Sequence, residues 1–257
     1  MSKWVPLTRT DHSDSHWKPR DGFHFASAQL YVSISTIELN KLLPHYVLGF
    51  IEVGERFEAV ALLGIGGKQN LYINSDGKWL GGYTPAALRG YPFVLAENGD
   101  NGKILCIEES HLSTNVDDNP VFDADGEVGE ETGKMFEFLT HCVEQQIKTR
   151  SAVKSLAEAG LIEEWPIKVR IESRENEIEL KGFFRINESA LNQLKAEKVG
   201  HLRNYGALPL AYAQLFSMSQ LEQLAQRAKF IGEQLNEANV NIDFLSQDEG
   251  VINFDGI

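Results

Sequence analysis

The sequence predicts an α+β protein with a strand-rich antiparallel N-terminal half and a helical C-terminal half that contains one β-hairpin. Two changes of pattern along the 257 residues support this. Residues 23–112 contain short β-branched and aromatic runs separated by turn residues, as in antiparallel strands. From Glu130 onward, apolar residues recur at helical spacing, and over residues 167–184 they alternate with charged residues.

The first clear element is a hairpin. Residues 46–53 and 57–65 are β-branched and aromatic, and only Gly54-Glu55-Arg56 separates them. Before this hairpin, residues 36–43 indicate a short helix that Thr36 caps and Pro44 ends.

Two shorter strand signals follow the hairpin. Residues 71–73 and Trp79 flank an Asp76-Gly77 pair, which suits a tight turn with positive φ. Residues 103–108 have the composition of another short strand.

The C-terminal half begins with a long helix over residues 130–159. Two glutamates lie at its start, and lysine and arginine lie toward its end before Gly160, an arrangement that complements the helix dipole. Residues 167–184 then alternate in two runs, which predicts a hairpin with one apolar face.

Further helices are expected beyond this hairpin. Asn187 caps one that carries Leu191, Leu194 and Val199 and that Gly206 breaks. Residues 208–230 indicate two helices that meet near Ser217. The alternation that starts at Val240 suits an edge strand on this chain or on a partner.

These patterns divide the chain into four segments. We expect an N-terminal arm (1–22), a strand-rich region (23–132), a helical region with the hairpin 167–184 (133–231), and an acidic tail (232–257). The two central segments are expected to pack together as one domain.

Composition restricts the functional classes. The formal net charge is −13, and a field of that sign repels phosphate backbones, so no nucleic-acid partner is expected. No apolar run approaches the roughly 20 residues that a membrane helix needs, so no membrane insertion is expected. The two cysteines are too few for a disulfide framework, and no secretory signal is visible, which favours a cytoplasmic protein.

Three patterns resemble functional motifs without the features that the chemistry requires. Residues 64–67 follow a strand but precede no helix, so a glycine turn is favoured over a dinucleotide loop. Residues 123–126 lack the first and twelfth ligands of a calcium loop. His12 and Asp14 have the spacing of an iron site, but they lie in a polar arm. We therefore expect neither a metal nor a cofactor, and no catalytic residue is identified.

The most unusual segment is residues 79–93. It contains Trp79, Tyr83, Arg89 and Tyr91, together with two prolines and Phe93. Tryptophan, tyrosine and arginine dominate binding surfaces because each gives a large contact area with a polar group. Two interpretations stay open: a recognition surface, or core aromatics with Arg89 in a structural bond.

The same segment resembles a known family, and other blocks agree with that family in the same order. Gly77-Lys-Trp79 and Tyr83-Thr-Pro85-Ala-Ala-Leu-Arg89-Gly-Tyr91-Pro92-Phe93 are similar to the G-x-W and Y-x-P-x-x-x-R-x-Y-P-F core of the bacterial SapC family. The further similar blocks are Phe23-His-Phe25-Ala26, Leu62-Leu63-Gly64, Asn70-Leu71-Tyr72, Leu105-Cys106-Ile107-Glu108 and Pro120-Val-Phe122-Asp123-Ala-Asp125-Gly126. The resemblance covers about residues 16–230 and departs at Gly90, where a second arginine is usual.

The resemblance implies no established reaction. It favours an accessory or binding protein that takes a partner protein or small ligand through Trp79, Tyr83, Arg89 and Tyr91. Glu38 and Asn70 are the further polar candidates.

Two alternatives follow from the surroundings of family members. One is an enzyme or enzyme subunit, either a non-haem iron oxygenase or a protein associated with a flavin halogenase. The other is a surface-layer component. The identity of the partner and assembly as a homo-oligomer stay open.

Overall fold

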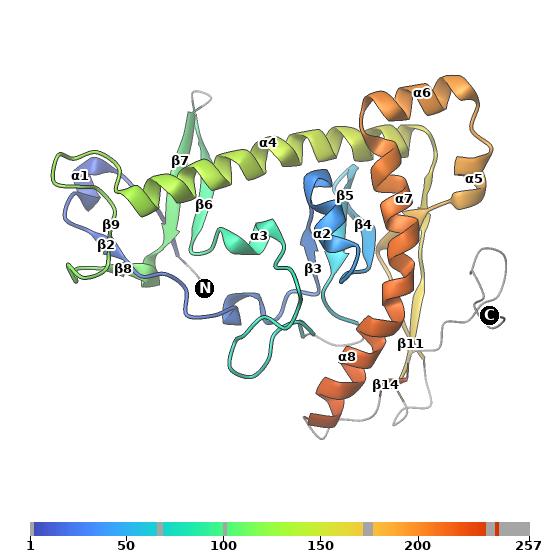
Figure 1. Ribbon diagram of the computed structural model, residues 1–257, viewed down its shortest axis with the longest axis horizontal. Helices are drawn as coiled ribbons and strands as arrows, with labels where there is room; N and C mark the ends of the chain where they lie inside the picture. Colours follow the sequence, from blue (N-terminus) through green and yellow to red (C-terminus); the bar gives the residue numbers. More distant parts are fainter. Residues whose placement is uncertain (1–2, 66–68, 100–101, 172–176, 235–239, 242–257) are drawn as a thin grey trace.

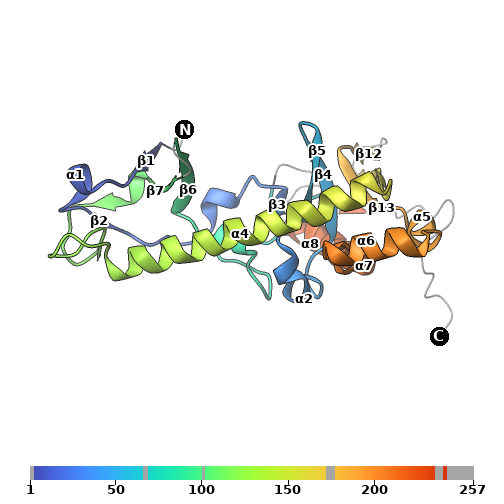
Figure 2. The same ribbon diagram turned by 90° about the horizontal axis from the view of Figure 1, so that it is seen from above.

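The computed structural model describes residues 3–65, 69–99, 102–171, 177–234 and 240–241. Its longest described element is α4 (Glu130–Glu158), whose 29 residues span about 43 Å at a rise of about 1.5 Å per residue. Figures 1 and 2 show α4 running along the long axis, with a small lobe near its first turns and a large lobe near its last turns. The expected helix is therefore confirmed, and it ends one residue early, just before Gly160, whose φ is +73°.

The large lobe is built on a five-stranded sheet in the order β10-β13-β4-β5-β3, in which every neighbouring pair is antiparallel. Its strands are β3 (Tyr31–Ser33), β4 (Leu48–Val53), β5 (Arg56–Leu62), β10 (Ile162–Glu164) and β13 (Phe183–Ile186). The expected hairpin is β4–β5, and Gly54 at its turn has a φ of +64°. Phe50 and Val60 lie on opposite faces of this sheet and are both fully buried, so the core covers both faces.

Helix α7 (Ala207–Ser217) ties the C-terminal region to this sheet through two buried polar side chains. The Gln214 side chain accepts from the Ile186 amide (2.8 Å) and donates to the Leu48 carbonyl (3.3 Å). The Ser217 hydroxyl accepts from the Leu48 amide at 2.9 Å. These bonds satisfy backbone groups on two different strands, so they fix where α7 lies on the sheet.

The small lobe contains two three-stranded sheets, in the orders β1-β7-β6 and β8-β2-β9. Their strands are β1 (Trp4–Pro6), β2 (His16–Trp17), β6 (Phe93–Asn98), β7 (Gly102–Glu108), β8 (Leu112–Ser113) and β9 (Asn119–Pro120). Residues of the expected N-terminal arm thus supply β1 and β2. Trp17 packs edge-on against Phe93 in the small core, with ring centroids 4.7 Å apart, and α4 covers this core with Met135 and Leu139.

The second hairpin is present as β11 (Ile167–Ile171) and β12 (Glu177–Leu180), paired antiparallel. Its turn lies outside the described residues. Beyond Leu180 the chain leaves the hairpin at Gly182 (φ +84°) and enters β13 of the large sheet, so the expected second strand is divided. β14 (Val240–Asn241) pairs with β11, as the alternation at Val240 indicated. Residues 232–234 of the expected acidic tail belong to the last helix, and residues 235–239 and 242–257 lie outside the described residues.

The remaining described elements are short helices. The α-helices are α1 (Arg9–His12), α2 (Leu39–Leu42), α3 (Ala86–Arg89), α5 (Glu188–Asn192), α6 (Ala196–Asn204) and α8 (Leu221–Gln234). The 3₁₀ turns are η1 (His24–Ala26), η2 (Thr36–Glu38), η3 (Glu109–His111) and η4 (Met218–Gln220). The fold class is α+β, as the sequence predicts, and the two helices expected within residues 208–230 are α7 and α8.

Three local predictions were wrong. Ser35, and not Thr36, caps the first short helix, because its side chain and that of Glu38 form a capping box. The helix expected after Asn187 is divided into α5 and α6, a break that lets both Leu191 and Leu202 reach the large core while Val199 stays partly exposed. Residues 71–73 form no strand, and only Ile73 bridges to Trp79.

Candidate functional site

Glu38 is the centre of the first group of candidate residues. Its side chain is 5% exposed and accepts three hydrogen bonds. One oxygen accepts from the Ser35 amide (3.2 Å), and the other accepts from the Tyr83 hydroxyl (2.8 Å) and the Ala86 amide (2.7 Å). This buried carboxylate therefore joins η2 to the first residue of α3.

Tyr83 carries the connection from Glu38 to Arg89. Its hydroxyl donates to Glu38 and accepts from Nη2 of Arg89 at 3.2 Å. Burial is the largest cause that raises the pKa of Tyr83 to about 12, followed by the hydrogen bond to Glu38. The phenol therefore stays protonated at neutral pH. We call Glu38, Tyr83 and Arg89 the junction cluster, because α3 lies under α4 between the two lobes (Figure 1).

Arg89 lies between two aromatic rings at the end of α3. Its guanidinium carbon is 5.5 Å from the centre of the Tyr83 ring and 5.1 Å from the centre of the Phe138 ring of α4. Such contacts hold the guanidinium in a fixed plane. Its Nε is covered and has no hydrogen-bond partner among the described residues, so one donor of a partly buried cation is unsatisfied.

Trp79 contacts the backbone of Tyr83 and makes no side-chain hydrogen bond to the junction cluster. Its indole Nε1 donates to the Tyr83 carbonyl (3.0 Å) and to the Tyr46 hydroxyl (3.2 Å). Its ring stacks on Tyr72, with centroids 5.7 Å apart. These bonds fix the backbone at Tyr83, so Trp79 acts on the cluster through the position of that residue.

Asn70 lies apart from the other candidates. Its side chain is 1% exposed, donates to the Ala26 carbonyl (3.2 Å) and accepts from the Tyr72 amide (2.9 Å). Both partners are backbone groups, so these contacts place Asn70 as a link between η1 and the loop before Trp79.

Tyr91 belongs to the small-lobe side of the same region. Its ring stacks on Phe25, with centroids 3.9 Å apart and planes 6° apart, and its hydroxyl donates to Glu108. His111 lies within 3.1 Å of that hydroxyl. Burial, and then the hydrogen bond to Glu108, raise the pKa of Tyr91 above its ordinary value.

Arg20 connects the junction cluster with Tyr91, and the sequence analysis did not identify it. Its Nη1 donates to the carbonyls of Arg89 (3.0 Å) and Tyr91 (3.2 Å), and its guanidinium carbon lies 4.7 Å from the centre of the Phe23 ring. Burial, and then the charge of Arg89, lower the pKa of Arg20. Arg20 thus bonds to the backbone of both Arg89 and Tyr91 from a distant part of the chain.

A hollow of about 280 Å³ opens beside Arg20. We call it the Arg20 hollow. It is lined by Trp17, Pro19, Arg20, Tyr91, Pro92 and Met135. Met135 lies one helical turn from Phe138, the α4 residue that contacts Arg89, so the hollow adjoins the junction cluster along α4.

The model of the SapC family matches residues 7–224. The chain belongs to the SapC family. No curated protein and no solved structure matches it. The family match spans both lobes and includes Arg20, the junction cluster and the residues that line the Arg20 hollow, so the region described above lies within the part of this SapC protein that the family shares.

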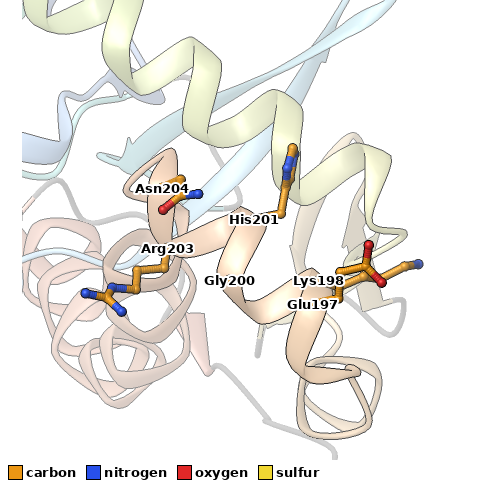
Figure 3. A pocket seen from close by; sticks show the side chains of 6 residues that line it. All are labelled: Glu197, Lys198, Gly200, His201, Arg203 and Asn204. Carbon is orange, nitrogen blue, oxygen red and sulfur yellow. The ribbon is translucent and has the colours of Figure 1, made fainter.

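A larger hollow, of about 650 Å³, lies along α6 and is lined by Glu197, Lys198, Gly200, His201, Arg203 and Asn204. All six residues are exposed and come from one helix. Figure 3 shows their side chains spreading away from the helix without converging. This surface therefore lacks the converging polar groups of a binding site.

The described residues give two further results. No group of three His, Cys, Asp or Glu side chains among them could hold a metal ion. His12, which has the spacing of an iron site in the sequence, accepts a hydrogen bond from the Thr8 amide through Nδ1 at 3.3 Å. Within this part of the chain, no helix has the length and apolar character needed to cross a bilayer.

Proposed function

We propose that this SapC-family chain is an accessory or binding protein that takes a small ligand in the Arg20 hollow, next to the junction cluster. The observation that carries the proposal is the Arg20 hollow itself, which is lined mainly by apolar and aromatic side chains together with one guanidinium. Next to it, Arg89, whose carbonyl accepts from Arg20, has a covered Nε without a partner among the described residues, whereas buried donors in native proteins almost always have one.

The chemistry of the nearby titratable groups supports binding over catalysis. Tyr83 has a pKa of about 12, so it cannot act as a base at neutral pH. Burial is the largest cause that raises the pKa of the Cys142 thiol, and burial also raises that of Cys106, so neither has the lowered pKa of a reactive thiol. The Glu38 carboxylate already accepts three hydrogen bonds.

Mass spectrometry of the full chain, purified from its own host, tests this proposal. We expect the native spectrum to show a small-molecule mass excess that disappears in the denatured spectrum of the same sample. An Arg20→Gln variant, purified in parallel, should carry less of the excess, whereas Arg203→Gln should carry as much as the native protein. Arg203 is a suitable control because it is an exposed arginine on α6, in the other lobe.

Three results would contradict the proposal. A host-purified chain without any mass excess would show that no small ligand is bound. A mass excess as large as a protein would show that the partner is a macromolecule. An excess that both arginine variants keep in full would place the ligand outside the Arg20 hollow.

A further inference from the structure

Helix α7 has an inverted distribution of polar and apolar side chains. Its polar Gln214 and Ser217 are buried against the sheet, and the helix contains no charged residue. Tyr212 is 44% exposed and Phe216 is 65% exposed, more than any other aromatic side chain among the described residues. A surface helix of a globular protein normally turns its polar residues toward the solvent. The opposite arrangement indicates that the outward side of α7 is a contact surface.

The outward residues of α7 form one continuous apolar stripe. Tyr212 and Phe216 are one turn apart, and their rings stack with centroids 6.2 Å apart. Leu208 and Pro209 lie one turn before Tyr212, and Leu215 precedes Phe216; none of the five is buried. We call these five residues the α7 face. Contiguous apolar surface of this kind marks an interaction site.

The charge of the neighbouring helices narrows the choice of what covers the α7 face. Residues 195–234 contain five lysine or arginine side chains and three acidic ones, although the whole chain has a net charge of −13. Lys198 and Arg203 are exposed on α6 before the face, and Lys229 is exposed on α8 after it. Two copies of this region would repel each other, so the charge favours an acidic segment over a second copy.

The chain itself contains a segment with this chemistry. Residues 242–257, which lie outside the described residues, have seven aliphatic or aromatic side chains, four acidic ones, and no lysine or arginine. They follow β14, which lies against α8 (Figure 1). Their 16 residues can span about 53 Å at about 3.3 Å per residue. Since α7 and α8 together are at most about 37 Å long, the segment can reach the whole α7 face.

We propose that residues 242–257 dock on the α7 face. Their apolar side chains cover Tyr212 and Phe216, and their acidic side chains face the basic residues of α6 and α8. Because the segment is tethered to β14, its effective concentration is high and the contact forms within one chain. The α7 face lies in the large lobe, so this inference is independent of the Arg20 hollow and goes beyond the proposed function.

Photo-crosslinking in the full chain tests this inference. One variant carries p-benzoylphenylalanine in place of Tyr212, and a control variant carries it in place of Tyr31, which is also 44% exposed but lies on the edge strand β3. Mass spectrometry of the digested, irradiated monomer locates the residues that the label has attached to. We expect the label at position 212 to attach to residues 242–257 at least about fivefold more often than the label at position 31.

Two further changes separate the apolar contact from the charged one. Phe254→Ser should lower the yield at position 212 by at least about threefold, because it removes an apolar ring, and its neighbour Asn253→Ser should change the yield by less than about twofold. The yield in the native segment should also fall when the salt is raised to about 1 M, because salt screens the charges. Thermal unfolding reports whether each labelled variant is folded.

Several results would overturn the inference. A product with the mass of two chains would assign the α7 face to a second copy. Equal attachment from positions 212 and 31, or attachment from position 212 only to other residues, would remove residues 242–257 from the face. A yield that Phe254→Ser leaves unchanged would overturn the apolar contact, and a yield that does not depend on salt would overturn the role of the acidic side chains.

Discussion

The two lobes differ in how much apolar surface each can bury. The core of the small lobe contains six buried apolar residues, whereas that of the large lobe includes the five-stranded sheet, α7 and the second half of α4. Because α4 contributes to both, the small lobe depends on a helix that the large lobe anchors. The candidate site lies between them, on the N-terminal segment and α3. The candidate residues thus lie next to the lobe with the smaller core, where local opening is expected to cost less free energy.

The largest expected effect comes from emptying each core in turn. Phe50→Ala in the large core should lower the free energy of unfolding by about 3–5 kcal/mol and speed amide exchange throughout the chain. Trp17→Ala removes a large ring from the small core and the 2.9 Å bond from its indole to Thr132. We expect the Trp17 variant to speed exchange mainly in β6, β7 and the first turns of α4.

Hydrogen exchange read by mass spectrometry distinguishes these patterns. Equal acceleration in β4 and β5 of the Trp17→Ala variant would contradict the dependence of the small lobe on the large one, because the two lobes would then open together.

A second, smaller effect is expected at the link between the lobes. Glu38→Ala leaves the Tyr83 hydroxyl and the Ala86 amide without their acceptor, and each unsatisfied buried group costs about 1–3 kcal/mol. Glu38→Gln keeps an acceptor oxygen and should cost less. Urea denaturation of both variants measures the difference. If Glu38→Ala were as stable as the native chain, Glu38 would not hold α3 in place.

A smaller effect still is expected at alkaline pH. The pKa of Tyr83 rises from 10 in the unfolded chain to about 12 in the folded one, so folding favours the protonated phenol. This contribution is fully present below pH 10 and is lost as the pH rises toward 12. Burial is also the largest cause that raises the pKa of Tyr46, Tyr72 and Tyr91, so the native chain should lose stability above pH 10.

The Tyr83→Phe variant isolates the contribution of that hydroxyl. Unfolding free energies measured at pH 8 and pH 11 should fall less between the two values in the variant than in the native chain. An equal fall in both proteins would show that the Tyr83 phenol is not buried against Glu38 as described.

Much of the fold could be predicted because its signals are local. The β4–β5 hairpin has Gly54 where a positive φ is required, and α4 has acidic residues at its start and Gly160 just beyond its end. The break between α5 and α6 could not be predicted, because it depends on Leu191 and Leu202 both reaching a core built by distant strands. Propensity alone does not record such a tertiary requirement.

The site was predictable in part for the same reason. Glu38 lies three residues after Ser35, a capping-box spacing that local sequence shows, and Tyr83 and Arg89 share one motif segment. Arg20 had no such signal: it is a single arginine in a polar segment, 69 residues from the carbonyl that it binds. Only the folded chain brings it to Arg89.

The proposal that a small ligand binds in the Arg20 hollow is best tested by a crystal structure of the full chain purified from its own host. We expect density for a small molecule in the hollow, within hydrogen-bond distance of the Arg20 guanidinium. Density for a small molecule only elsewhere, for example along α6, or ordered water alone in the hollow, would contradict the proposal.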